Sequence, residues 1–147
     1  MLRSRVRELS ALCRMMRETE TLLRFQALEF PELFARLRRT GAFASLPLLD
    51  ECGRRLSDGE RLADAWEAAV TDATRRSALD NGDRAALLDF GNGLGATDLE
   101  GQLNHVRLHR ELLSDRLRVA EENAEARGKV YITLGICAGV GLCMLLI

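Results

Sequence analysis

Two histidines stand four residues apart in the segment HVRLH, at positions 105 and 109. On a helix this spacing places both imidazoles on one face, where they could chelate a metal with a third ligand from elsewhere. The segment lacks the glutamate that follows the first histidine in zinc proteases. The cysteines give no CxxC pair; they are Cys13, Cys52, Cys137 and Cys143. We therefore expect a solvated histidine pair, no metal site and no disulfide framework.

A glycine-rich segment, FGNGLG, spans Phe90 to Gly95. It invites comparison with phosphate-binding loops, but its spacing is not GxGxxG and no predicted strand precedes it. Its glycines are better suited to supply positive φ at a helix C-terminus and to let two helices approach closely. No Ser, Cys or carboxylate arrangement suggests a nucleophile or an acid/base pair. The sequence therefore predicts no enzyme and no cofactor.

The last residues, Val130 to Ile147, carry no charge and follow Arg127 and Lys129. At about 1.5 Å per residue this run spans roughly 27 Å as a helix, enough to cross a hydrocarbon core. The alternative is a buried helix of a soluble domain. The basic pair on its N-terminal side predicts a domain at 1–129 that faces the cytoplasm and a single-pass cell-membrane anchor at 130–147. The lipid bilayer is thus the first expected partner.

Small residues recur every four positions within that tail, at Gly135, Gly139 and Cys143. This GxxxG spacing is typical of a face on which membrane helices pack. The alternative is the ordinary enrichment of glycine in membrane helices.

The rest of the chain has a helical composition, with no isoleucine and four valines before residue 130. Leucine, alanine, arginine and glutamate abound instead, which predicts an all-α bundle. Prolines and glycines divide it into about six helices. We expect helices at 4–28, 31–39 and 46–56, and a fourth around Trp66. A break at Asn81 and Gly82 should precede a short fifth helix, which Asp83 caps and which ends at Phe90. A sixth helix should begin at Asp98, with a capping box at Thr97 and Glu100. Trp66 is expected to anchor the core.

Two of these helices carry long apolar seams. The first seam comprises Leu2, Val6, Leu9, Cys13, Met16, Leu23 and Ala27. The last comprises Leu99, Leu103, Val106, Arg110, Leu113, Leu117, Ala120 and Ala124. Each seam is interrupted by one charge, Glu20 in the first helix and Arg110 in the last. If the helices pack together, these two could form a buried ion pair; otherwise both point to the rim.

Charge gives a further exclusion, because the formal net charge is only −1. Nucleic-acid binding would need a larger basic excess with interleaved aromatic residues, so no nucleic-acid partner is expected. The opening arginines, Arg3, Arg5 and Arg7, could sit beside anionic lipid headgroups or simply form a solvated helix face.

The chain resembles the stage III sporulation protein AB family over nearly its whole length. The shared pattern is FG, two residues, LG, two residues, Asp and then Gln, after an SDGE turn and a Trp-containing helix. It is matched here by Phe90, Gly91, Leu94, Gly95, Asp98 and Gln102. The family is similar to the helical domain of type II secretion F proteins, which are inner-membrane platform proteins. These six residues are the candidate structural or interaction motif, and they could serve folding alone.

The resemblance implies a platform subunit of the apparatus that links mother cell and forespore. It would couple a secretion-type ATPase, stage III sporulation protein AA, to other membrane subunits. The chain could also form a homo-oligomer. The family usually carries an N-terminal hydrophobic segment, whereas this chain begins with MLRSRVREL. Either that segment is missing here or this member has one anchor, and the face of Gly135 and Gly139 would then lack a neighbour from its own chain.

Two other functions are open. The chain could be a tail-anchored helical adaptor unrelated to sporulation, which would bind other partners. It could instead be a membrane-tethered enzyme or nucleotide-binding regulator. In that case its ligand should stabilise the folded protein by about 2.7 kcal/mol when present at a hundredfold excess over the dissociation constant.

Overall fold

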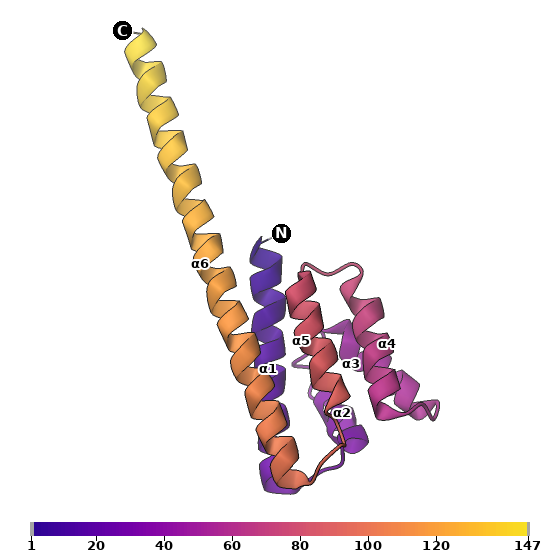
Figure 1. Cartoon of the computed structure of the whole chain (residues 1–147). Helices are drawn as coiled ribbons and strands as arrows, with labels where there is room; N and C mark the ends of the chain where they lie inside the picture. Colours follow the sequence, from indigo (N-terminus) through magenta and orange to yellow (C-terminus); the bar gives the residue numbers. More distant parts are fainter. Residues whose placement is uncertain (1, 147) are drawn as a thin grey trace.

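The computed structural model describes residues 2–146, and every regular element in that range is a helix. The helices are α1 (Leu2–Gln26), α2 (Phe30–Arg39), α3 (Pro47–Ser57), α4 (Leu62–Thr74), α5 (Asn81–Asn92) and α6 (Leu99–Leu146). The first five pack with the N-terminal half of α6, and the rest of α6 projects from the bundle (Figure 1). This confirms the predicted all-α bundle with a long apolar C-terminal helix, a candidate to span a membrane.

Helices α1 and α6 lie side by side and run antiparallel (Figure 1). The start of α1 therefore lies beside the point at which α6 leaves the bundle. Helix α6 is unbroken across Gly128, so bundle and tail share one helix of 48 residues. One glycine inside a helix costs only about 1 kcal/mol relative to alanine, which neighbouring turns can absorb.

Local signals explain most of the helix ends. Helices α2 and α3 each have a proline in the first turn, where no backbone N–H is needed. Gly41 after α2 and Gly59 after α3 have φ of 69° and 89°, in the left-handed region that glycine adopts freely. The predicted bounds of these helices agree within one or two residues.

The end of α1 differs from the prediction. The helix stops at Gln26, and Ala27 has a φ of 48°. Ala27 is exposed and does not belong to the buried stripe. A residue with positive φ cannot continue a right-handed helix, so the chain turns here towards α2.

The start of α5 corrects a second expectation. Asn81 and Gly82 do not break the chain but form the first turn of α5. The cap is Asp80, whose side chain accepts a hydrogen bond from the Asp83 N–H at 2.8 Å. Asp83 accepts one in return from the Asp80 N–H at 3.1 Å, completing a capping box. Caps satisfy the free N–H groups of a first turn, so weak helix formers are tolerated there.

At the start of α6 the predicted capping box of Thr97 and Glu100 is wrong. Asp98 is the cap, because its Oδ1 accepts a hydrogen bond from the Gly101 N–H at 2.9 Å. The helix therefore begins at Leu99, one residue later than expected.

The core lies between α1, the base of α6 and the four middle helices, α2 to α5. Trp66 is fully buried, and its indole N–H donates to the Leu87 carbonyl at 2.7 Å. This confirms Trp66 as a core anchor. Around it the rings of Phe34 and Phe90 pack at centroid distances of 5.7 and 5.3 Å.

The two predicted seams meet as expected in most positions. Leu9, Cys13, Met16 and Leu23 of α1 are buried, as are Val106, Leu113 and Ala120 of α6. Leu99 is 44% exposed, so its place in the seam is wrong. Gln102 is the first buried residue of α6, so the packed region starts one turn later than Leu99.

Candidate functional site

The six residues of the candidate motif gather where α5 turns into α6. Phe90, Gly91, Leu94 and Gln102 are buried, whereas Gly95 and Asp98 are exposed. The two exposed residues determine the local backbone conformation. Gly95 has a φ of 75°, which glycine adopts freely, and Asp98 caps α6.

Gln102 ties the loop to α6. Its Oε1 accepts a hydrogen bond from the Gly95 N–H at 3.3 Å. Its Nε2 donates to the Gly93 carbonyl at 3.2 Å and to the Thr97 hydroxyl at 3.1 Å. A buried amide that closes three such bonds fixes the path of the loop.

Two glycines of the loop face aromatic rings. A Cβ added at Gly91 would come within 2.0 Å of Trp66 Cδ1, and one at Gly93 within 2.2 Å of His105 Cε1. Real Cβ atoms do not approach so closely. The prediction that these glycines permit close approach is therefore confirmed, and positive φ is confirmed at Gly95.

The loop is not arranged as a phosphate cradle. The N–H groups of Gly93, Leu94 and Ala96 donate to the carbonyls of Phe90, Gly91 and Gly93. The Gly95 N–H is taken by Gln102. Because phosphate loops need free N–H groups that point at the ligand, this geometry disfavours nucleotide binding.

The two histidines do not form the solvated pair that we expected. His109 is only 7% exposed, and both imidazoles pack on Phe90 at centroid distances of 5.4 and 5.6 Å. His105 Nε2 donates to the Phe90 carbonyl at 2.7 Å, and His109 Nδ1 donates to the His105 carbonyl at 3.0 Å. These tautomers follow because a carbonyl can only accept. Burial lowers the pKa of His109, so its ring is neutral at pH 7.

Sequence reasoning missed the burial of His109 because α6 has a second buried stripe, Gln102 and His109, that faces α5. The seven-residue step from Gln102 to His109, which returns to the same side of a helix after two turns, was the sequence signal for this second stripe. Within residues 2–146, no group of three His, Cys, Asp or Glu side chains could hold a metal ion.

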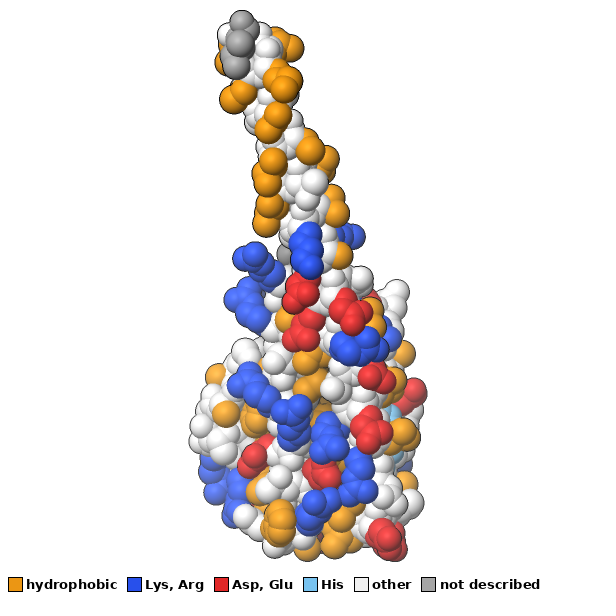
Figure 2. Space-filling model, turned by 90° about the vertical axis from the view of Figure 1, so that its left-hand side faces the viewer, with side chains coloured by type: hydrophobic (Ala, Val, Ile, Leu, Met, Phe, Trp, Pro, Cys, Tyr) orange, Lys and Arg blue, Asp and Glu red, His pale blue; other side chains and the backbone are white. Residues whose placement is uncertain are grey.

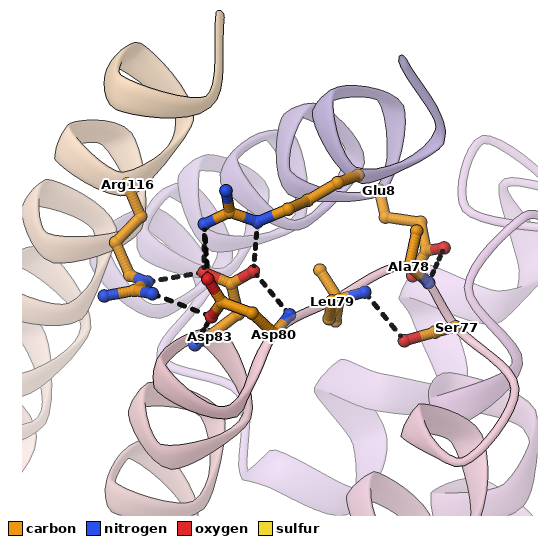
Figure 3. A network of polar contacts seen from close by, with 8 residues as sticks. Glu8, Ser77, Ala78, Leu79, Asp80, Asp83 and Arg116 are labelled. Carbon is orange, nitrogen blue, oxygen red and sulfur yellow. Dashed lines mark hydrogen bonds and ion pairs between the residues drawn. The ribbon is translucent and has the colours of Figure 1, made fainter. Parts of the chain in front are cut away.

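A buried ion cluster joins α1, α5 and α6 (Figure 3). Its centre is Asp83, whose side chain is fully buried. Arg5 Nε donates to Asp83 at 2.8 Å, and Arg116 Nε donates at 2.5 Å. Both guanidinium groups also reach Asp80, at 3.0 and 2.8 Å. Arg5 is thus neither a lipid contact nor a solvated residue, contrary to both sequence interpretations.

Burial raises the pKa of the Asp83 carboxyl, but the hydrogen bonds from Arg5, Arg116 and the Asp80 backbone outweigh it and lower the pKa overall. Beside this cluster, Glu8 of α1 accepts a hydrogen bond from the Ala78 N–H at 3.0 Å (Figure 3). The connection from α4 to α5 is thereby tied to α1 as well.

A second ion cluster confirms the predicted pairing of Glu20 with Arg110. Arg110 Nη1 lies 2.5 Å from Glu20 Oε2, and Arg107 Nε lies 3.4 Å from Oε1. Arg24, one turn along α1, donates to the same carboxylate at 3.1 Å. Glu20 is 7% exposed, so this carboxylate is held between α1 and α6 rather than at the rim.

We expect Glu20→Ala to lower the free energy of unfolding by about 2–3 kcal/mol, less than for a fully enclosed pair because Arg110 is partly hydrated. A double-mutant cycle with Arg110→Ala, measured by chemical denaturation of the full chain, should give a coupling energy of about 1–2 kcal/mol. Additive effects of the two substitutions would show that the pair is not energetically linked. Arg118→Ala, which removes an exposed pair with Glu122, is the matched control and should change stability by less than about 0.5 kcal/mol.

The glycines of the predicted packing face in the tail have no neighbouring helix within the described residues. Gly128 follows Ala124 by four residues, and Gly135 and Gly139 follow at steps of seven and four. Such steps stay on one side of a helix, so the glycines continue the side of α6 that packs on α1. A Cβ at Gly135 or Gly139 would meet nothing within 4 Å, and Cys143 is exposed. Helix packing at this face stays a prediction.

Comparison with known proteins identifies the family. The family model of stage III sporulation protein AB matches residues 1–147. A solved structure of a stage III sporulation protein AB (SpoIIIAB) superposes with a TM-score of 0.74 at 18% identity. The superposition covers 84% of this chain and 98% of that one, and it shows a shared fold. A comparison with the curated proteins gave no match. On the strength of the family model, which spans the whole sequence, the chain belongs to the stage III sporulation protein AB family.

Proposed function

We propose that this protein is a non-enzymatic platform subunit of the channel apparatus between mother cell and forespore. It would lie in the mother-cell membrane with its bundle in the cytoplasm and couple a secretion-type ATPase, stage III sporulation protein AA, to other membrane subunits. Membership of the family supports a sporulation-related role. The family is a structural sporulation family and not a known family of enzymes.

The observation that carries the proposal is the continuity of α6. One helix serves both as a wall of the bundle and as the candidate membrane span. Its bundle half is held at two heights, by Glu20 through Arg107 and Arg110, and by Asp83 through Arg116. Ion pairs at two heights resist tilting of α6 against α1. A force on the bundle would therefore reach the anchor through a rigid helix.

The adaptor alternative, unrelated to sporulation, has lost its support because the family model spans the chain. A nucleotide-binding regulator is disfavoured by the loop between α5 and α6, whose N–H groups are engaged internally.

Two measurements test the proposal. The first is crosslinking in sporulating cells, detergent extraction and affinity capture of the full chain. Recovery of the ATPase is expected. Capture of other proteins without the ATPase, while the apparatus is present, would contradict the platform role.

The second measurement tests rigidity at the junction. Arg127→Pro combined with Ala126→Gly should break α6 between bundle and tail, because proline removes a helix hydrogen bond and clashes with the preceding turn. The matched control is Arg127→Ala, which loses the same charge and keeps the helix. We expect the broken variant to fold, reach the membrane and capture the ATPase, yet fail to support spore formation. Normal spore formation by the broken variant would exclude mechanical coupling through α6.

A further inference from the structure

One side of α6 carries a line of apolar side chains that the bundle leaves exposed. Leu108, Leu112 and Val119 are 61%, 42% and 43% exposed, although they belong to the half of α6 that packs in the bundle. They follow at steps of four and seven residues, which return to one side of a helix because about 18 residues make five turns. The residues that α6 buries lie on its other sides; they are Gln102, Val106, His109, Leu113 and Ala120.

The apolar line continues into the tail without a charged residue. Steps of four and seven lead from Val119 to further exposed residues, Ala126, Val130, Cys137 and Met144. Because α6 is unbroken, these side chains extend the line on one continuous helix. Figure 2 shows hydrophobic side chains along the projecting helix, whereas the charged side chains stop near its base. The line therefore runs from the bundle almost to the end of the candidate membrane span.

The length of the line decides what kind of partner can cover it. From Leu108 to Val119 it is about 18 Å long, so a strip one helix wide, about 10 Å, covers only about 200 Å² on each partner. From Leu108 to Met144 it is about 55 Å long, which gives about 1,100 Å² over both partners, the size at which specific interfaces begin. A partner must therefore follow the line both outside the membrane and within it.

We infer that a second copy of this chain docks on this line, with the two α6 helices parallel. A second copy has the helix that the line requires, because α6 continues without a break from the bundle into the candidate span. Two copies anchored in one bilayer stand at the same depth, so each residue of the line is level with its counterpart. A two-fold axis along the helices brings the two lines together, and the interface closes at two copies. The inference is independent of the platform role.

The charges beside the line are compatible with this arrangement. By their helical steps, Asp115 and Glu122 lie on one edge of the line. Asn123 and Arg127 lie on the other edge. The two-fold axis sets each edge beside the opposite edge of the second helix, so the carboxylates of the two copies do not face each other. An antiparallel pair would send the two tails to opposite sides of the contact, where one bilayer could not hold both.

Two cysteines of the tail distinguish this line from the glycine face. Cys137 lies on the apolar line, whereas Cys143 continues the side of Gly135 and Gly139. The other cysteines, Cys13 and Cys52, are buried in the bundle. A disulfide needs Cβ atoms about 3.5–4.5 Å apart, so oxidation of the thiols reports which side of α6 meets the second copy.

The first test treats membranes that contain the full chain with copper phenanthroline in air, and non-reducing electrophoresis measures the product. We expect a linked species with the mass of two copies. Cys137→Ala should abolish this species, and Cys143→Ala, the matched control, should leave it unchanged. Loss with Cys143→Ala but not with Cys137→Ala would assign the contact to the glycine face. Absence of any linked species would also overturn the inference.

A second test addresses the bundle half of the line. In a chain that carries Cys137→Ala and Cys143→Ala, the further change Val119→Cys should give the linked species. Arg118→Cys, at an exposed neighbouring position that points to another side of α6, should not. Linking through Cys137 without linking through Val119→Cys would overturn the inference, because the two copies would then meet only in the membrane.

Introduced charge gives a quantitative test in detergent, with the mass measured by light scattering. Wild type should have the mass of two copies. Leu112→Glu combined with Val119→Glu should weaken dimerisation on the order of a hundredfold, because the contact would bury carboxylates without partners. The matched control, Phe25→Glu with Leu99→Glu, changes exposed apolar residues away from the line and should leave the dimer intact. Circular dichroism checks that each variant is folded. A single-copy mass for wild type, or equal effects of the two folded variants, would overturn the inference.

Discussion

Replacement of Asp83 by alanine is expected to lower the free energy of unfolding by about 3–5 kcal/mol, because it leaves buried charges without their partner. The carboxylate is fully buried and holds Arg5, Arg116 and the Asp80 N–H. Without it, two guanidinium groups that are 14% and 29% exposed would face one another with only Asp80 to share. Chemical denaturation of the full chain in detergent, followed by circular dichroism, measures the loss.

Asp80→Ala provides the control for this prediction. Asp80 caps the same helix and contacts the same arginines, but its side chain is 48% exposed. Losing it should cost about 1 kcal/mol, the usual value of an N-cap. Equal losses for the two substitutions would mean that burial of Asp83 does not decide the energetics of the cluster.

The same site gives a dependence on pH. The pKa of Asp83 is lowered in the folded chain, so the unfolded chain binds its proton first as the pH falls. The stabilising contribution is therefore complete above the ordinary pKa of about 3.9 and is lost as the pH falls through the lowered folded-state value. Wild type should lose stability over that acid window. Asp83→Asn should show a smaller loss there.

Replacement of Trp66 by alanine is the second large expected effect, a loss of about 3–5 kcal/mol. The indole is fully buried between Phe34 and Phe90, and its N–H donates to the Leu87 carbonyl. The substitution would leave a cavity at the centre of the bundle and remove the hydrogen bond from the indole to the Leu87 carbonyl. Trp66→Phe should cost less, because it keeps an aromatic ring against Phe34. Thermal unfolding of the full chain would rank the two variants.

Gly91→Ala approaches the same contact from α5. A methyl group there would press on the Trp66 ring, which has no free side to move into, so a loss of about 1–3 kcal/mol is expected. Gly128→Ala is the matched control, because its Cβ meets nothing within 4 Å and alanine favours the helix. If the two substitutions changed stability alike, the motif glycine would have no packing role, and its place in the family pattern would need an external partner.

Much of the fold could be predicted because its signals are local. Prolines in first turns, glycines after helix ends and seams with steps of three and four residues act within one or two turns of chain. They predicted the six helices, the long apolar tail and a seam along the first and last helices that calls for a packing partner. The pairing of Glu20 with Arg110 was one of two alternatives that the sequence left open, and the structure decided for it by packing the two seams together.

Features that depend on a third helix could not be predicted. Asp83 was expected to be a cap, since nothing in its neighbourhood reveals arginines 78 and 33 residues away in the chain. The histidines of α6 were expected in solvent, because the sequence pattern revealed only one apolar seam, whereas the helix buries a second side against α5. Within the motif, the pattern predicted a shaped region, and only the folded structure shows which residue caps α6, which has positive φ and which closes the loop.

By itself, the sequence determined that this protein is a helical bundle with a long apolar helix at its end, since helix propensity, caps and hydrophobicity are properties of short segments. Only the tertiary structure shows that α6 continues unbroken through Gly128 and that Asp83 links α1, α5 and α6 through ion pairs. These features rest on burial and on distances between helices, which arise only when the chain has packed.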